Sequence, residues 1–305
     1  MRFPPREDDI SGSIPPRIKI RGILETVMKS KVKFLIIFLT LFSWPFNLFL
    51  ANTKADFIRY LIPLVILGIG YFLWTKKKDY FLLPILAIPF FEPKLALFPI
   101  AFIAAYSFCS KTFKKHLVFL ALSILVFAFV WKPFYGQTIF TLDYQARQQV
   151  LRNITLYPNP PLARMFQNKV KVYSDKFISN LFALTDPNNY FFGFHPREIT
   201  ITNQNLEKYP FLAVVFALIG IFVLGKSKNK EFIITSFVSL IIGLSVLNSF
   251  DRNDFILWLP ISLVIVEGVR YFFVLKNKKL IYLFTIIFIL FALIQFVRNY
   301  VNFVG

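Results

Sequence analysis

Cysteine and histidine are scarce in this chain, and the familiar sequence motifs of several enzyme classes are absent. The single Cys109 excludes an intrachain disulfide framework and any cysteine-based metal site. The sequence contains no Walker loop, GxGxxG, HExxH or CxxC motif, and no convincing Ser-His-Asp grouping around its two histidines. The sequence therefore has no motif that would carry out ATP hydrolysis, zinc proteolysis or redox chemistry. We expect neither a metal ion nor a cofactor.

Charged residues are also few, at 17% of the chain, whereas hydrophobic residues make up 56% and phenylalanine occurs 40 times. A soluble protein of 305 residues needs a larger polar shell than this composition provides. The formal net charge of +19 would suit nucleic acid, but the basic residues stand in short clusters between apolar runs. We therefore predict membrane lipids as partners, and no nucleic acid.

Apolar runs long enough to enter a bilayer occur along most of the chain. They predict an all-α, polytopic membrane protein with about nine embedded helices, in segments 34–51, 57–75, 80–109, 116–131, 210–225, 232–250, 254–275 and 280–298. Segment 80–109 counts as a hairpin of two short helices, because Glu92-Pro93-Lys94 interrupts it and its four prolines argue against one straight helix. The predicted regions are a tail (1–32), N-terminal membrane helices (33–131), a long loop (132–209) and C-terminal membrane helices (210–305).

The positions of the lysines predict the orientation. If the N-terminal tail is cytoplasmic, the clusters within 76–78, 111–115, 226–230 and 276–279 all fall on the cytoplasmic side, as the positive-inside rule requires. This result holds only if the hairpin 80–109 enters and leaves on the same side. The loop 132–209 and the C-terminus then lie outside the cytoplasm, and we expect a bacterial plasma (inner) membrane.

The loop 132–209 is too long and too polar to be a simple connection. Within it, residues 172–184 have the spacing of an amphipathic helix lying in the membrane interface, with Ser179 and Asn180 on its polar side. Asp186-Pro187-Asn188 predicts a turn. We expect Tyr190–Phe194 to dip into the interface and to hold the following residues at head-group level.

Three stretches together resemble the GT-C glycosyltransferases, which are multi-spanning enzymes such as protein mannosyltransferases and aminoarabinose transferases. The stretches are FLLPILAIPFFEPKLALFPIAFIAAY (81–106), DPNNYFFGFHPRE (186–198) and NSFDRNDFILWLPISLVIVEG (248–268). The resemblance spans roughly residues 57–275 and implies a polyprenyl-phosphate-sugar donor whose phosphate contacts Lys94 and Arg252. GT-C enzymes carry a catalytic acid in a large first outer loop, but here that loop is only about Asn52–Asp56. The chain thus resembles a member that lacks the N-terminal catalytic part.

Charge and position suggest further site residues, each with a plainer alternative. Lys94 with Glu92 could hold a phosphate at the hairpin turn, or form a turn with a solvated acid and a lysine that reaches water. Arg252 could bind an anionic head group, or pair with a neighbouring aspartate. Asp56 is the first candidate for the catalytic acid by position.

In the long loop, His195 and Arg197 could supply a proton donor and an anion clamp, or simply belong to a solvated segment. Asp143 is the second candidate for the catalytic acid. The leading hypothesis is a GT-C-like glycosyltransferase, or a degenerate homologue, that handles a polyprenyl-phosphate-linked sugar at the outer face. The alternative is a non-catalytic lipid- or glycolipid-binding protein or subunit, with a partner membrane chain supplying further helices. A small-molecule transporter is a third possibility, disfavoured because no internal repeat is visible.

Overall fold

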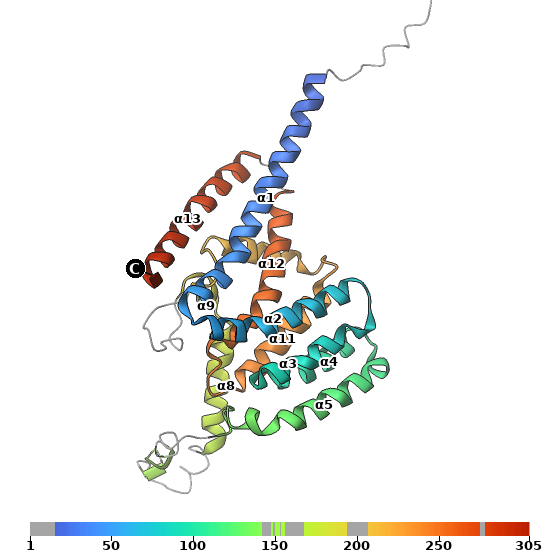
Figure 1. Cartoon of the computed structure of the whole chain (residues 1–305), viewed down its shortest axis with the longest axis vertical. Helices are drawn as coiled ribbons and strands as arrows, with labels where there is room; N and C mark the ends of the chain where they lie inside the picture. The colour runs from blue at the N-terminus through green and yellow to red at the C-terminus, as the bar shows by residue number, and fades with distance from the viewer. Residues whose placement is uncertain are drawn as a thin grey trace, which may run out of the picture.

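The structure of the chain is a computed structural model that describes residues 16–141, 168–193, 207–274 and 278–304, together with a few positions between 148 and 155. Within these residues the fold is all-helical and contains no strand (Figure 1). A single bridge joins Thr138 to Leu247. The predicted all-α class is confirmed for the described part of the chain.

Five of the described helices contain a stretch long and apolar enough to cross a membrane. The crossing stretches are Ser30–Ala51 of α1 (Pro16–Ala51), all of α2 (Lys54–Thr75) and α5 (Phe113–Tyr135), Arg252–Phe272 formed by η3 (Asp251–Leu257) and α12 (Trp258–Phe272), and Lys279–Asn302 of α13 (Lys278–Val304). The chain is therefore an integral membrane protein.

Shorter helices occupy the other predicted segments. They are α3 (Leu82–Phe91), α4 (Leu97–Cys109), α10 (Ala213–Leu224) and α11 (Lys230–Ser245). At 1.5 Å per residue, a helix of 10 to 16 residues is shorter than the hydrocarbon core. The figure of nine membrane-embedded helices thus stays a prediction.

The chain reverses direction between α3 and α4, so that the two helices form a hairpin. A one-turn helix, η2 (Pro93–Leu95), separates them, and Glu92 caps it by accepting a hydrogen bond from the Lys94 backbone N–H at 3.4 Å. At the start of α2, Arg59 bonds to Glu92 at 2.8 Å, whereas at the end of α2 the Trp74 indole donates to the Tyr106 hydroxyl of α4 at 3.1 Å. The turn therefore lies beside the beginning of α2, and α4 runs back toward its end.

Two ends of the fold can be distinguished by these contacts. At one end, the lysine-containing 226–230 connection meets the end of α12, where Ser227 donates to Glu267 at 3.0 Å. We call this the lysine end. At the other end, the Ile139 N–H after α5 donates to the Val246 carbonyl after α11 at 2.9 Å. In Figure 1 the α2–α3 and α4–α5 connections lie together, opposite the α3–α4 turn.

The helices α10 and α12 approach each other unusually closely through two glycines. A Cβ added to Gly220 would collide with the Val264 carbonyl oxygen of α12, and one added to Gly268 would collide with the Phe216 carbonyl oxygen of α10. Small residues permit such close backbone contact in membrane helices. These two positions set the distance between the two helices.

The predicted amphipathic helix exists as α8 (Lys169–Thr185), and one residue of its predicted polar side is buried against the protein. Asn180, expected on the polar side, is buried, and its amide donates to the carbonyls of Ser245 (3.2 Å) and Leu247 (2.7 Å) at the end of α11. Ile178 and Phe182 are exposed instead. Unpaired carbonyls at a helix end need donors, and Asn180 supplies them.

The next segment also differs from expectation. The predicted turn at Asp186 is present, since its carboxylate accepts a hydrogen bond from the Asn188 N–H at 2.9 Å. The chain then forms the one-turn helix α9 (Asn188–Phe191), in which Tyr190 and Phe191 are buried in the protein core. They pack against Trp44 and Tyr209 respectively, whereas Phe192 is 51% exposed and Phe194 lies outside the described residues.

Candidate functional site

Four of the charged side chains at the end of the fold opposite the lysine end are Arg59, Glu92, Lys94 and Arg252. We call them the outer rim, because the sequence predicts that this end faces outward. Glu92 is buried, with 1% of its surface exposed, and both of its oxygens accept from Arg59, at 2.8 and 3.3 Å. Such a two-point contact is among the stronger ion-pair geometries. Glu92 is therefore committed to holding the hairpin turn against α2 and is not the solvated acid that the sequence allowed.

The two cations predicted to contact phosphate both lie on the elements that meet at this rim. Lys94 is half-buried in η2, and Arg252 is half-buried in η3, which packs against α2 and α11. The Nη1 atom of Arg252 is buried and has no hydrogen-bond partner among the described residues. A buried guanidinium N–H without an acceptor is costly, so this atom is suited to meeting an anion.

A buried ion pair lies one turn further along η3. Lys208 is fully buried and bonds to the buried carboxylate of Asp254 and to the side-chain oxygen of Asn189. The Lys208 ammonium also lies over the rings of Trp44 (5.2 Å) and Tyr190 (5.3 Å). We call Lys208 and Asp254 the buried pair, and Asn189 is its amide partner.

The surroundings of the buried pair are largely aromatic. The ring of Trp44 contacts those of Tyr190, Tyr209 and Phe255, which come from three separate segments. Burial raises the pKa of the Tyr209 hydroxyl, which is hydrogen-bonded to Ser262 at 2.9 Å. Tyr209 is therefore neutral at physiological pH, and the charge of Lys208 is balanced by Asp254.

An apolar cavity of about 350 Å³, which we call the apolar groove, begins on the other side of Tyr190. Its lining is almost entirely hydrocarbon and comes from α9, α10, α11 and α12. It extends from Thr185 and Pro187 at the outer end to Leu224 and Ile233 near the 226–230 connection. A groove with this lining is suited to an acyl or isoprenoid chain.

The remaining sequence candidates have separate outcomes. The connection between α1 and α2 is shorter than expected, so Asp56 lies in the first turn of α2, where it is exposed and accepts from the Thr53 hydroxyl at 2.7 Å. Thr53 in turn accepts from the Asp56 N–H at 3.2 Å, completing an N-terminal cap. Asp143, His195 and Arg197 lie outside the described residues.

The buried pair was missed by sequence reasoning. Arg252 was expected to bind a phosphate or a neighbouring aspartate, but Asp254 bonds to Lys208 instead. The available signal was Lys208 itself, a charge that stands next to Glu207 and shortly before the apolar run that begins at Pro210. A charge at such a position needs a partner, but its partner is 46 residues away.

Comparisons with known proteins found no matching family model, no matching curated protein and no matching solved structure. Within the described residues there is also no group of three or more His, Cys, Asp or Glu side chains placed to hold a metal ion. The interpretation of the site therefore depends on its own chemistry.

Proposed function

We propose that this protein binds a lipid-linked phosphate, with the phosphate at the outer rim and the hydrocarbon chain in the apolar groove. The observation that carries the proposal is the buried Nη1 of Arg252, which has no hydrogen-bond partner in the part of the chain that the structure describes. Arg59 is already paired with Glu92 and also lies near the carboxylate of Asp56, so Arg252 is the rim cation on which the proposal depends. Arginine also matches the geometry of phosphate oxygens.

The buried pair supports this proposal by connecting the two parts of the site. The helix η3 carries Arg252 to the rim and Asp254 to Lys208, while Tyr190 has Lys208 on one side and lines the groove. A long-chain lipid phosphate needs polar surroundings for its phosphate and apolar surroundings for its hydrocarbon chain. The outer rim and the apolar groove provide these. A polyprenyl phosphate, the carrier used by the GT-C glycosyltransferases that the sequence resembles, has this chemistry.

The proposed setting is a bacterial plasma membrane, with the N-terminus in the cytoplasm and the outer rim outside. Support comes from the clusters at 76–78 and 226–230, which the structure brings to one end of the fold. Excess lysine on one side is the usual mark of the cytoplasmic face.

Sugar transfer is the more specific form of this proposal. A carboxylate would take the proton of the acceptor hydroxyl while the new glycosidic bond forms and the carrier phosphate leaves with the electrons of its sugar bond. Asp56 and Asp143 are the candidates. The capping role of Asp56 favours the alternative of a non-catalytic lipid-binding protein, because this acid already has a structural task.

Binding of a polyprenyl phosphate by the purified protein in phosphatidylcholine nanodiscs tests the proposal. We expect Arg252→Ala and Lys94→Ala each to weaken binding roughly tenfold or more, the usual effect of losing a charge-assisted hydrogen bond. Lys54→Ala is the matched control, because Lys54 is an exposed lysine at the same end of the fold. Equal affinity of all three variants and wild type would contradict the assignment of the rim.

The groove is tested by a pair of substitutions on α11. Val238 lines the groove and Ile242 does not, yet both are 43% exposed and lie one turn apart. Val238→Trp is expected to block the hydrocarbon chain and weaken binding several-fold, while Ile242→Trp leaves it unchanged.

An assay of sugar transfer from a polyprenyl-phosphate sugar then separates the two forms of the proposal. Binding without transfer, or transfer unaffected by Asp56→Asn and Asp143→Asn, excludes these acids as catalytic residues.

A further inference from the structure

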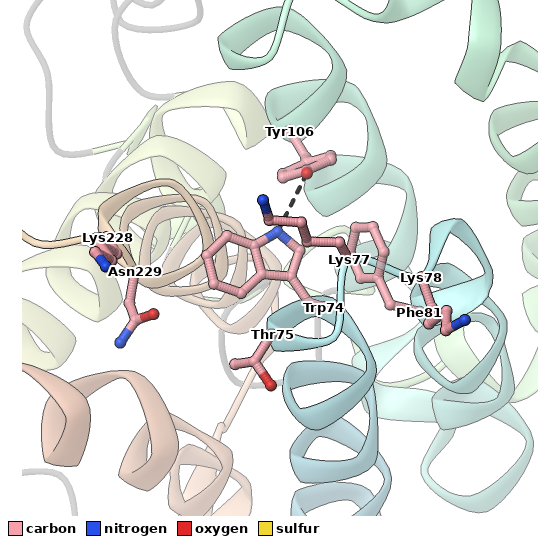
Figure 2. A pocket seen from close by; sticks show the side chains of 8 residues that line it. All are labelled: Trp74, Thr75, Lys77, Lys78, Phe81, Tyr106, Lys228 and Asn229. Atoms are coloured by element: carbon pink, nitrogen blue, oxygen red, sulfur yellow. Dashed lines mark hydrogen bonds between the residues drawn. The ribbon is translucent and has the colours of Figure 1, made fainter.

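A second cavity, of about 420 Å³, lies at the lysine end of the fold, and we call it the basic pocket. Its lining comes from the end of α2, the turn into α3, the end of α4 and the α10–α11 connection, namely Trp74, Thr75, Lys77, Lys78, Phe81, Tyr106, Lys228 and Asn229. In Figure 2 the Trp74 indole lies between Lys228 and Asn229 on one side and Lys78 and Phe81 on the other. The outer rim contributes none of these residues.

The lining combines positive charge with a rigid aromatic wall. Three of the eight lining residues are exposed lysines, and none is acidic. Trp74 and Tyr106 are held together by their 3.1 Å hydrogen bond, drawn in Figure 2. Among the side chains that the structure describes, the Glu267 carboxylate reaches the edge of the pocket, where it accepts from Asn229 at 3.5 Å, but Glu267 also pairs with Arg270 at 3.3 Å. The pocket is therefore positively charged.

The backbone that presents Lys77 has a conformation rarely adopted by lysine. Its φ is 55°, in the left-handed region, and the N–H groups of Lys77 and Lys78 donate to the Trp74 and Leu73 carbonyls at 2.8 and 3.2 Å. This is a helix-ending turn in which glycine is the usual residue. Lysine at this position keeps a cation at the pocket at a cost in backbone energy, as strained residues at binding sites do.

We propose that the basic pocket binds the phosphate of a glycerophosphate ester, supplied by an anionic phospholipid in the leaflet at the lysine end. Phosphate is favoured because three lysines and Asn229 are among the residues that line a cavity large enough for a small head group. A lipid source is favoured because large apolar side chains near the pocket are exposed, including Phe72 and Phe108, which are 59% and 84% exposed. Basic pockets between membrane helices bind anionic head groups in this way.

The chain offers a matched pair of variants to test this site. Lys111, at the end of α4, has a φ of 54° and the same type of helix-ending turn, but it does not line the pocket. Lys77→Gly and Lys111→Gly thus remove one charge each from the same end and relieve the same backbone conformation. Only Lys77→Gly removes a charge from the pocket. We expect both variants to be at least as thermally stable as wild type.

The experiment measures retention of phosphatidylglycerol against phosphatidylcholine after detergent exchange of the full-length protein. Wild type and Lys111→Gly are expected to retain phosphatidylglycerol preferentially, whereas Lys77→Gly and Lys228→Ala lose about fivefold in that preference. Equal losses in Lys77→Gly and Lys111→Gly, or no preference in wild type, would overturn the proposal. In a second arm, soluble glycerol phosphate competes with the lipid. If glycerol phosphate displaces the lipid at millimolar concentration, the pocket binds phosphate but its ligand is a free ester. If it does not displace the lipid, the result supports the phospholipid as the ligand.

Discussion

Replacement of Asp254 by alanine is expected to lower the free energy of unfolding by about 3–5 kcal/mol, the usual cost of leaving one charge of a buried pair without its partner. The expectation follows from the burial of both members, since the Lys208 and Asp254 side chains are 0% and 2% exposed. Lys208 has hydrogen-bond and cation–π contacts with neutral groups, but Asp254 supplies the balancing charge. The change is measured as a fall in Tm of the protein in detergent micelles, followed by size-exclusion chromatography after heating.

Two further variants separate this effect from a general loss of packing. Arg270→Ala removes the 55% exposed partner of Glu267 and is expected to cost less than about 1 kcal/mol. Lys208→Met combined with Asp254→Leu removes both charges and is expected to recover much of the loss caused by Asp254→Ala. If Asp254→Ala lowers the Tm no more than Arg270→Ala does, the buried pair does not hold this end of the fold together.

The second large effect is expected at the glycines between α10 and α12. Gly268→Ala would place a methyl group against the Phe216 carbonyl, and Gly220→Ala would place one against the Val264 carbonyl. A backbone group cannot rotate away as a side chain can, so the two helices must separate. We expect each variant to lose at least the roughly 1–3 kcal/mol typical of overpacking, together with a smaller monodisperse fraction after purification.

Gly68→Ala provides the control for this prediction. Gly68 lies within α2 and has nothing within 4 Å of an added Cβ. Alanine is preferred to glycine inside a helix by roughly 1 kcal/mol, so this variant should match or exceed the Tm of wild type. A Tm for Gly268→Ala equal to that of Gly68→Ala would show that α10 and α12 do not depend on this close approach.

Hydropathy and prolines predicted the helical segments of this fold well. The lysine spacing predicted that residues 76–78 and 226–230 share one end, and the structure places Lys77, Lys78 and Lys228 around one pocket. The interruption at Glu92-Pro93-Lys94 predicted a break, and α3 and α4 are separate helices there. These features depend on local composition and on the requirement that a chain alternate between two sides of a membrane.

Two of the features that were not predicted depend on partners distant in the sequence. Asn180 looks like a solvent-facing residue until the unpaired carbonyls at the end of α11 are placed beside it. Lys208 looks like a flanking charge until η3 brings Asp254 to it. Asp56 was singled out as an acid in a loop, but its role as a cap depends on where α2 begins. The first two pairings join residues at least 46 positions apart, so residue spacing could not show them, whereas the Thr53–Asp56 cap is a local pairing three residues apart.

The buried pair also has a consequence for the order in which the protein assembles. Trp44 is synthesised first, Lys208 more than 160 residues later, and Asp254 only after both α10 and α11 have been made. Until η3 emerges, the ammonium of Lys208 has no aspartate to neutralise it and stays in contact with water. The pair therefore closes only when these later helices have been inserted, so a chain truncated before residue 254 should remain open at this end and be recognised by membrane quality-control proteases.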